Sequence, residues 1–253
     1  MKFYKELSSY NAFTLSDATK IIGGLPATKK YLAEMVKAGY VKKIRNNLYT
    51  CYDFALNSDC ANRFQIASSI NENSYISYHS AFELYGFYGQ TFYEIQVSSR
   101  KRFSPFEYDG YSYECFPNHI DIQIDTIQGA KVTSIERTIV DSINMLGKVM
   151  DIEELVKCID LIHLVNEIKL LGVLETYHKE ILYRKVGYIL SHYKNEFRLS
   201  DAFFNVCLTK GVPSNKGCLV INDKRNLKFN SKWGLYVYPN LEEITSKGGN
   251  LDV

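Results

Sequence analysis

The chain has 253 residues, of which 46% are hydrophobic and 23% charged, with 30 Lys and Arg against 28 Asp and Glu. This composition is ordinary for a folded globular protein, and it excludes global disorder, a collagen-like sequence and a disulfide-stapled miniprotein. The formal net charge of +2 excludes a protein that is basic throughout. The length is sufficient for one large domain or two smaller ones.

The positive charge is concentrated at the start of the chain. Residues 1–50 hold nine Lys and Arg but only three Asp and Glu, a net charge of +6, so the remainder carries a net −4. A basic segment in front of a mildly acidic body indicates nucleic-acid contact by the basic part. Charge alone leaves open a second interpretation, in which the segment is simply a solvated charged surface.

The sequence shows no membrane span or metal motif. No stretch approaches the ~18 consecutive apolar residues that a bilayer requires, and no long apolar run follows the first charges. The six cysteines contain no Cys-x-x-Cys pair and no His at zinc-ligand spacing, so we expect reduced thiols. We therefore expect a cytoplasmic protein with no metal, cofactor or membrane partner.

Helices are predicted throughout the first forty residues. Phe3 and Leu7 lie one helical turn apart on the face of a first helix. Thr14 or Ser16 caps a second helix, which the pair Gly23-Gly24 ends. A third helix follows, with a proline in its first turn, where a missing N–H costs nothing. Its apolar stripe comprises Tyr31, Leu32, Met35 and Val36.

A basic hairpin is predicted after the third helix. Gly39 ends that helix, and the short strands Val41–Arg45 and Leu48–Thr50 flank Asn46-Asn47, a pair that tolerates the positive φ of a tight turn. Three helices followed by a basic hairpin are typical of a winged helix-turn-helix. We therefore predict an α+β protein with a DNA-binding winged helix-turn-helix over 1–55, followed by a larger mixed α+β domain over 56–253.

The predicted DNA contacts follow from that fold. The second helix of a helix-turn-helix presents its N-terminal residues to base edges in the major groove, and basic wing residues meet phosphates. The candidate DNA-binding residues are Thr28, Lys29, Lys30, Tyr31, Lys42, Lys43, Arg45, Asn46 and Asn47. A winged helix used for protein contact is the alternative.

The body shows helical and strand patterns but little catalytic chemistry. Strands are predicted at Phe92–Val97, Tyr111–Phe116, Ile120–Ile124 and Lys131–Val132, and helices at Ser77–Gly86 and from Ser134 to Leu146. No Gly-rich phosphate loop, His-Glu-x-x-His or Gly-x-Ser-x-Gly motif occurs. We expect no catalytic residues.

Two groups of polar residues nevertheless stand out. His79 lies beside Ser77 and Ser80, for which we favour a structural role over catalysis. Arg137 and Asp141 lie four residues apart, the spacing of an ion pair on one helix face. Glu94-Ile95-Gln96 followed by a lysine only faintly resembles a nuclease metal site.

Three segments in this order resemble the AbiEi-type antitoxins of type IV, abortive-infection toxin–antitoxin systems. The segments are Gly39–Tyr49, Tyr75–Gly86 (Tyr-Ile-Ser-Tyr-His-Ser-Ala-Phe-Glu-Leu-Tyr-Gly) and Val132–Asp141 (Val-Thr-Ser-Ile-Glu-Arg-Thr-Ile-Val-Asp). The resemblance runs from the start of the chain to at least Asp141. Its motif positions are Ser77, His79, Ser80, Glu136, Arg137 and Asp141, which we interpret as structural.

The resemblance implies two functions. The winged helix is expected to bind inverted repeats in double-stranded operator DNA and to repress its own operon. The larger domain is expected to oppose a nucleotidyltransferase-like toxin in phage defence, without requiring a stable complex with it. Two alternatives remain: a winged helix fused to an enzyme such as a nuclease, and a protein-interaction adaptor.

Overall fold

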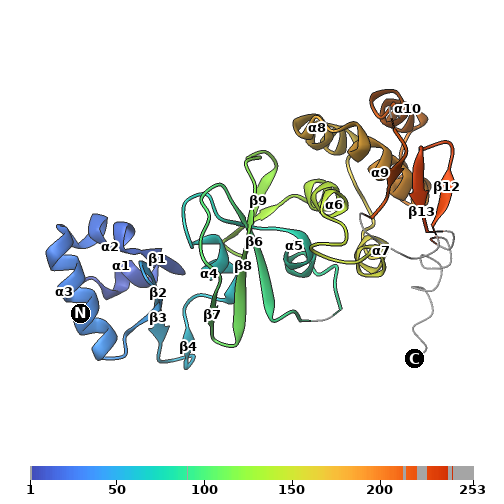
Figure 1. The fold of residues 1–253 in the computed structure, drawn as a ribbon. Helices are drawn as coiled ribbons and strands as arrows, with labels where there is room; N and C mark the ends of the chain where they lie inside the picture. Colours follow the sequence, from blue (N-terminus) through green and yellow to red (C-terminus); the bar gives the residue numbers. More distant parts are fainter. Residues whose placement is uncertain (1, 90, 213–214, 221–226, 239–240, 242–253) are drawn as a thin grey trace, which may run out of the picture. The chain divides into compact units, whose positions relative to one another are not determined.

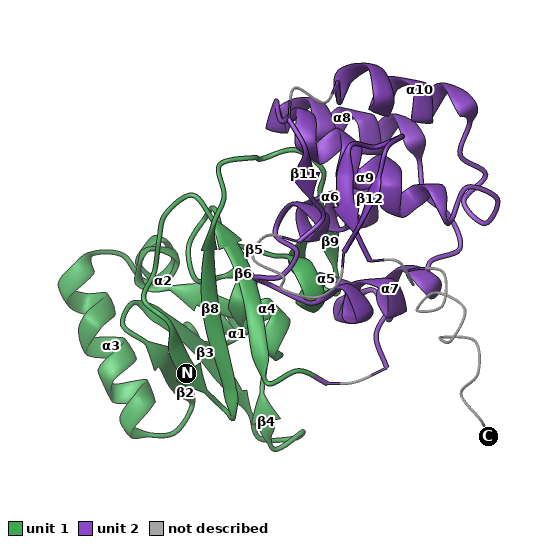
Figure 2. Cartoon of the chain, turned by 45° about the vertical axis from the view of Figure 1, so that its right-hand side comes forward, with its two compact units in different colours: residues 1–80, 92–133 green, residues 81–91, 134–253 purple. Residues whose placement is uncertain are grey.

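In the computed structural model the chain is a mixed α+β protein (Figure 1). The structure describes residues 2–89, 91–212, 215–220, 227–238 and 241. The chain divides into two compact units, residues 1–80 with 92–133 and residues 81–91 with 134–253 (Figure 2). The boundary predicted after residue 55 falls inside the first unit. Within the described ranges no helix is both long and apolar enough to cross a bilayer.

The first unit begins with the predicted helices and hairpin. The elements are α1 (Tyr4–Ser8), β1 (Ala12–Thr14), α2 (Leu15–Ile22), α3 (Leu25–Lys37), β2 (Val41–Arg45) and β3 (Leu48–Asp53). The short strand β1, which we did not predict, pairs antiparallel with β3, so that β3 lies between β1 and β2. We call residues 2–53 the N-terminal module.

The N-terminal module has its own hydrophobic core. Its fully enclosed side chains come from every element of the module, and they are Leu7, Phe13, Ala18, Leu32, Met35, Val41 and Cys51. Because helices and hairpin share one core, the exposed face of α3 is held in a fixed orientation relative to the hairpin. In both views of the fold the hairpin lies between α3 and the larger sheet of the same unit (Figures 1 and 2).

The larger sheet of the first unit has six strands. Their order across the sheet is β7 (Phe106–Tyr108), β8 (Tyr111–Pro117), β6 (Glu94–Ser99), β5 (Tyr75–Ile76), β10 (Ala130–Thr133) and β9 (Ile124–Ile127). Parallel and antiparallel pairs alternate across it. Two further elements of the chain are the strand β4 (Ser58–Asp59), which pairs with β3, and the helix α4 (Arg63–Ser68).

Most predicted strands and helices of the body are present, with shifted ends. The helix α5 (Tyr78–Leu84) lies within the predicted Ser77–Gly86, and α6 (Ile135–Asn144) lies within the predicted Ser134–Leu146. The prediction of a strand at Ile120–Ile124 was wrong, because Asn118 Oδ1 accepts a hydrogen bond from the backbone N–H of Ile120 and turns the chain there. The strand starts only at Ile124.

The second unit is mainly helical. Besides α6 it contains α7 (Ile152–Asp160), α8 (Glu167–Tyr177), α9 (Glu180–Ser191) and α10 (Asp201–Lys210), and a small sheet of β11 (Gly217–Cys218), β13 (Leu235–Val237) and β12 (Lys228–Asn230). The sequence also predicts short strands at Cys218–Ile221 and Trp233–Val237; β11 and β13 overlap them, and Ile221 lies outside the described ranges. Helix α9 is largely enclosed, with nine consecutive buried residues from Leu182 to Leu190.

Candidate nucleic-acid interface

Capping interactions set the start of α2 and the turn into α3. The Thr14 hydroxyl accepts a hydrogen bond from the Asp17 N–H, and the Asp17 carboxylate accepts one from the Thr14 N–H at 3.0 Å, which is a capping box. Gly23 and Gly24 then take φ values of +84° and +70°, which residues with a side chain rarely adopt. This turn aims the start of α3.

Helix α3 has one buried stripe and a basic exposed face. Thr28, Leu32 and Met35 are buried at i, i+4 and i+7, while Lys29 and Lys30 are exposed. The assignment of Thr28 to base contact is therefore not supported: its side chain lies on the buried stripe, and its hydroxyl donates to the Gly24 carbonyl at 2.9 Å. The two lysines remain available to an approaching duplex.

The side chain of Tyr31 is also less accessible than a base contact requires. Its ring is half-buried and packs edge-on against Phe3, with 5.5 Å between ring centres. Its hydroxyl oxygen is shielded from solvent. Tyr31 therefore contributes to the module's packing, where it cannot reach a base edge without rearrangement.

The two lysines of β2 face opposite sides of the hairpin. Lys42 lies opposite Thr50, and its ammonium forms an ion pair with Asp59 Oδ1 at 2.8 Å and lies 4.4 Å from the centre of the Tyr52 ring. The hydrogen bond to Asp59 raises the pKa of Lys42. Lys43 faces α3 instead and has no ion-pair partner among the described residues. Of the two, only Lys43 is free to meet a phosphate.

Arg45 is engaged within the first unit and is not free for DNA contact. Its guanidinium lies 4.6 Å from the centre of the Phe106 ring and 5.6 Å from that of Phe103, and it donates a hydrogen bond to the Ser104 carbonyl at 3.3 Å. Cation–π contacts of this kind are worth about 0.5–2 kcal/mol. The contacts join the hairpin to the segment that leads into β7, a tertiary relationship that the local pattern of β2 could not reveal.

The hairpin turn lies where we predicted it. Arg45 pairs with Leu48, so Asn46 and Asn47 form a two-residue turn, and Asn47 takes a φ of +70°. Both asparagines are exposed. The Asn47 side chain accepts a hydrogen bond from the backbone N–H of Leu15 at 3.3 Å, so the turn lies against the start of α2.

A depression lies between α3 and the hairpin. Its volume is about 490 Å³, and it is lined by Leu15, Lys29, Leu32, Ala33, Val36, Lys37, Lys43 and Tyr49. Three ammonium groups thus surround an apolar floor. Positive charge at the rim and an apolar floor are the chemistry that would suit phosphates and the sugars or thymine methyl groups beside them.

Lys37 is the residue of this surface that our DNA-contact set omitted. It follows Lys29 at i+8 and Ala33 at i+4, so the three share one face of α3. That spacing was visible in the sequence and identifies Lys37 without a structure. Lys30 lies beside these residues on α3, and Lys43 lines the same depression from β2. We call the surface that carries these four lysines the basic face: Lys29, Lys30, Lys37 and Lys43.

The motif residues of the first unit form a buried polar cluster. The Ser80 hydroxyl accepts a hydrogen bond from the Gln96 N–H at 2.9 Å, and the Ser98 hydroxyl donates to that of Ser77 at 2.9 Å. His79 is buried, stacks on Phe92 at 4.2 Å between ring centres, and lies 3.8 Å from Glu94, measured from Nε2 to Oε1.

Burial lowers the pKa of His79 to about 4, so this ring is neutral at physiological pH. The Ser80 hydroxyl lies 3.4 Å from His79 Nδ1, but Ser80 is fully buried. No substrate can reach it as a nucleophile. The contacts support the structural role that we assigned to Ser77, His79 and Ser80.

The motif residues of the second unit form a buried charge cluster. Arg137 and Asp141 are both fully enclosed, with Arg137 Nε 3.3 Å from Asp141 Oδ2, and the Tyr177 hydroxyl donates to Asp141 Oδ1 at 2.6 Å. Burial raises the pKa of Asp141, while Arg137 and Tyr177 oppose that shift. The Glu136 carboxylate accepts a hydrogen bond from the Asn166 N–H at 2.9 Å. The cluster thus joins α6 to the start and the end of α8.

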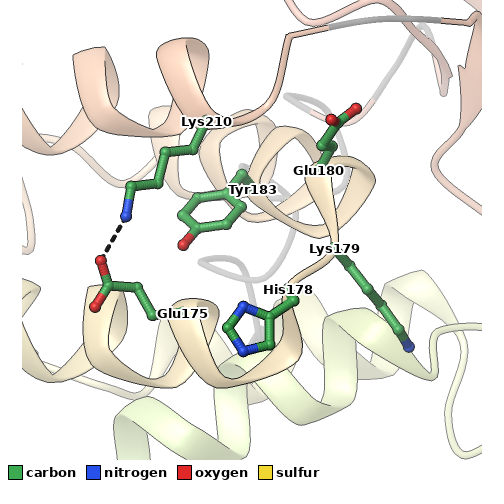
Figure 3. Close-up of a pocket in the computed structure, with 6 residues that line it drawn as sticks. All are labelled: Glu175, His178, Lys179, Glu180, Tyr183 and Lys210. Atoms are coloured by element: carbon green, nitrogen blue, oxygen red, sulfur yellow. Dashed lines mark hydrogen bonds and ion pairs between the residues drawn. The ribbon is translucent and has the colours of Figure 1, made fainter.

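The second unit has a polar depression of about 560 Å³, formed around the turn between α8 and α9 (Figure 3). Glu175 and Lys210 form an ion pair across it, and the Tyr183 hydroxyl points toward that pair. The opposite charges neutralise one another, and the depression shows no single-signed surface for an anion or a cation. Among the described residues, no three His, Cys, Asp or Glu side chains are grouped to hold a metal ion.

Comparisons with known proteins give a likeness of fold. The chain is similar to the RV2827C protein of Mycobacterium tuberculosis, whose crystal structure superposes with a TM-score of 0.64 over 98% of this chain and 94% of that one. The two sequences are 12% identical, so the likeness concerns the fold alone. No family model and no curated protein matches the sequence.

Proposed function

We propose that the N-terminal module is a winged helix-turn-helix that binds double-stranded operator DNA, with α3 as its recognition helix and β2–β3 as its wing. The observation that carries the proposal is the basic face, on which Lys29, Lys37 and Lys43 converge from two elements around one depression. DNA is the polyanion that such a surface fits, because each phosphate contact releases condensed counterions.

The geometry favours DNA over a protein partner for this surface. Lys29, Lys30 and Lys43 are exposed, and none of them pairs with a carboxylate in the part of the chain that the structure describes. Unpaired lysines are depleted in the cores of protein interfaces, whereas they are the usual donors to phosphate. The turn Asn46-Asn47 adds amide groups at the tip of the wing.

We further propose that the chain is the antitoxin of a type IV toxin–antitoxin system and represses its own operon. The support is the motif resemblance of Tyr75–Gly86 and Val132–Asp141. Under this proposal the rest of the chain opposes a nucleotidyltransferase-like toxin, and no stable complex is required. A neighbouring gene for such a toxin is the simplest observation in favour.

The nuclease alternative has less support. Gln96 Nε2 donates a hydrogen bond to Glu94 Oε1 at 3.2 Å, and the Gln96 Oε1 accepts one from the His79 N–H. These side chains are therefore occupied with holding His79 against β6 within the first unit rather than arranged around a metal ion. We retain the nuclease hypothesis only as an alternative.

Two assays on one double variant test the proposal. Lys29→Ala with Lys30→Ala should weaken binding to DNA from upstream of the gene in a mobility-shift assay, because both lysines lie on the basic face. The same variant should still restore growth when co-expressed with the neighbouring toxin. Unchanged DNA binding would contradict the assignment of α3, and loss of neutralisation would show that the two functions are not separable.

A further inference from the structure

We propose that Lys101 and Arg102, in the loop between β6 and β7, form a second DNA contact beyond the tip of the wing. This inference rests on the proposed function of the N-terminal module. It extends the DNA-binding surface from the basic face onto the six-stranded sheet of the same unit. The partner is the phosphate backbone of the duplex that flanks the bases read by α3.

A continuous series of contacts leads from the basic face to this loop. Lys29 and Leu15 line the same depression, and the Leu15 N–H donates to the side chain of Asn47 at the tip of the wing. Arg45, one residue before the turn, donates to the Ser104 carbonyl. Arg102 lies two residues before Ser104. The start of α3, the wing tip and the basic loop therefore follow one another.

The loop is held in place at both ends. It leaves β6 after Ser99, whose hydroxyl donates to the Asn71 side chain at 3.1 Å, and the Asn71 amide donates to the Lys101 carbonyl at 3.4 Å. At its other end Phe103 stacks with Arg45 and lies 6.3 Å from Phe106, measured between ring centres. A loop fixed in this way presents its charges at little entropic cost on binding.

Among the described residues, no carboxylate compensates the charges of Lys101 and Arg102. Arg100 forms an ion pair with Asp121 at 2.5 Å, so it is already neutralised. Lys101 and Arg102 are exposed, and their side chains have no partner in the described ranges of the chain. Two adjacent unpaired cations stand out here, because residues 51–253 carry a net −4.

The kind of contact follows from the chemistry. Both side chains are long and sit on a loop rather than on an element that enters a groove, so they fit phosphates rather than base edges. Phosphate contacts add affinity without sequence preference and steepen the dependence on salt. The inferred contact therefore strengthens binding to any flanking sequence.

The test compares salt dependence for the full-length protein and three double variants on one duplex from upstream of the gene. The variants are Lys101→Ala with Arg102→Ala, Lys29→Ala with Lys30→Ala, and Lys148→Ala with Lys157→Ala, a matched control that removes two exposed lysines of the second unit. Fluorescence anisotropy measures Kd between about 50 and 200 mM salt. Circular dichroism checks that each variant folds.

We expect the loop variant to raise Kd on the order of tenfold and to flatten the log–log salt slope by about 2, since two phosphate contacts are lost. The control variant should match the wild type. A second duplex, shortened by about one helical turn (10 bp) at the wing end, should abolish the difference between wild type and loop variant.

The outcomes separate this inference from the proposed function. A loop variant that matches the wild type in Kd and slope overturns the inference, while weaker binding by the Lys29/Lys30 variant still supports the assignment of α3. Equal losses in the loop and control variants also overturn it, because the effect would then be one of net charge. A wild type that does not bind the duplex overturns the proposed function and this inference together.

Discussion

The guanidinium of Arg45 lies 4.6 Å from the centre of the Phe106 ring, joining the hairpin of the N-terminal module to the strand at the edge of the six-stranded sheet. Lys42 makes a second connection through Asp59, which also accepts a hydrogen bond from the Tyr108 hydroxyl at 2.6 Å. Two of the five hairpin residues that we predicted to contact DNA, Lys42 and Arg45, thus anchor the hairpin. The basic face is left with Lys43 from β2.

We predict that Arg45→Ala lowers the free energy of unfolding by about 1–2 kcal/mol, since a cation–π contact and a charge-assisted hydrogen bond are lost. Arg45→Lys should cost nearly as much, because an ammonium replaces neither the planar stack nor the geometry of the donor. Urea unfolding measures both. A phosphate contact would behave differently, tolerating lysine and leaving stability unchanged.

Substitutions of the two lysines of β2 should have different effects, one on DNA binding and the other on stability. Lys43→Ala should flatten the salt slope of DNA binding by about 1 and leave stability unaltered, because its ammonium has no carboxylate partner among the described residues. Lys42→Ala should instead lower stability by about 1 kcal/mol, because Asp59 loses a charged donor. Anisotropy titrations and urea unfolding on both variants test this; reversed effects would contradict the assignment of the two hairpin faces.

Stability should fall in mild acid through His79. Burial lowers its pKa from 6.5 to about 4, so the folded protein binds this proton less tightly than the unfolded chain. The contribution of neutral His79 to the free energy of unfolding is therefore fully present above pH 6.5. It is lost as the pH falls toward 4, by on the order of 2–3 kcal/mol. Urea unfolding across this range should show the loss in the wild type. His79→Gln, which cannot titrate, should show a shallower decline; equal slopes would refute the assignment.

Substitutions in the buried charge cluster of the second unit should lower the free energy of unfolding by unequal amounts. Asp141→Asn removes the charge of the carboxylate that pairs with the enclosed guanidinium of Arg137, which should cost about 3–5 kcal/mol. Tyr177→Phe removes one hydrogen bond and should cost about 1 kcal/mol. Both values come from urea unfolding. Equal small losses would indicate that the charge of Arg137 is compensated by other groups.

Local chemistry sufficed to predict much of the N-terminal module. The cap Thr14 and the turn Asn46-Asn47 act within a few residues, and both are present. The strand β7 escaped prediction, because its three residues pair with β8 but show too short an alternation to be recognised. The strand β9 starts late because the Asn118 side chain turns the chain at Ile120, and Gln128 and Gly129, both at positive φ, then form the turn into β10.

The candidate site was predictable only in part. Helical spacing identifies Lys29 and Lys30 as neighbours of a buried stripe. Whether a cation of the hairpin is free depends on partners far along the chain, Asp59 for Lys42 and Phe106 for Arg45, which no local pattern specifies. The contacts of Arg45 with Phe103 and Ser104 also place the loop of Lys101 beside the hairpin, although the sequence shows only a short basic run.

We propose above all that the basic face binds DNA through its lysines. The most direct measurement is the salt dependence of Kd for upstream DNA, compared between the wild type and the triple variant Lys29→Ala, Lys30→Ala and Lys43→Ala. We predict that the wild type loses affinity steeply between about 50 and 200 mM salt and that the variant's log–log slope is shallower by about 3. Equal slopes and equal affinities for the two proteins would contradict it.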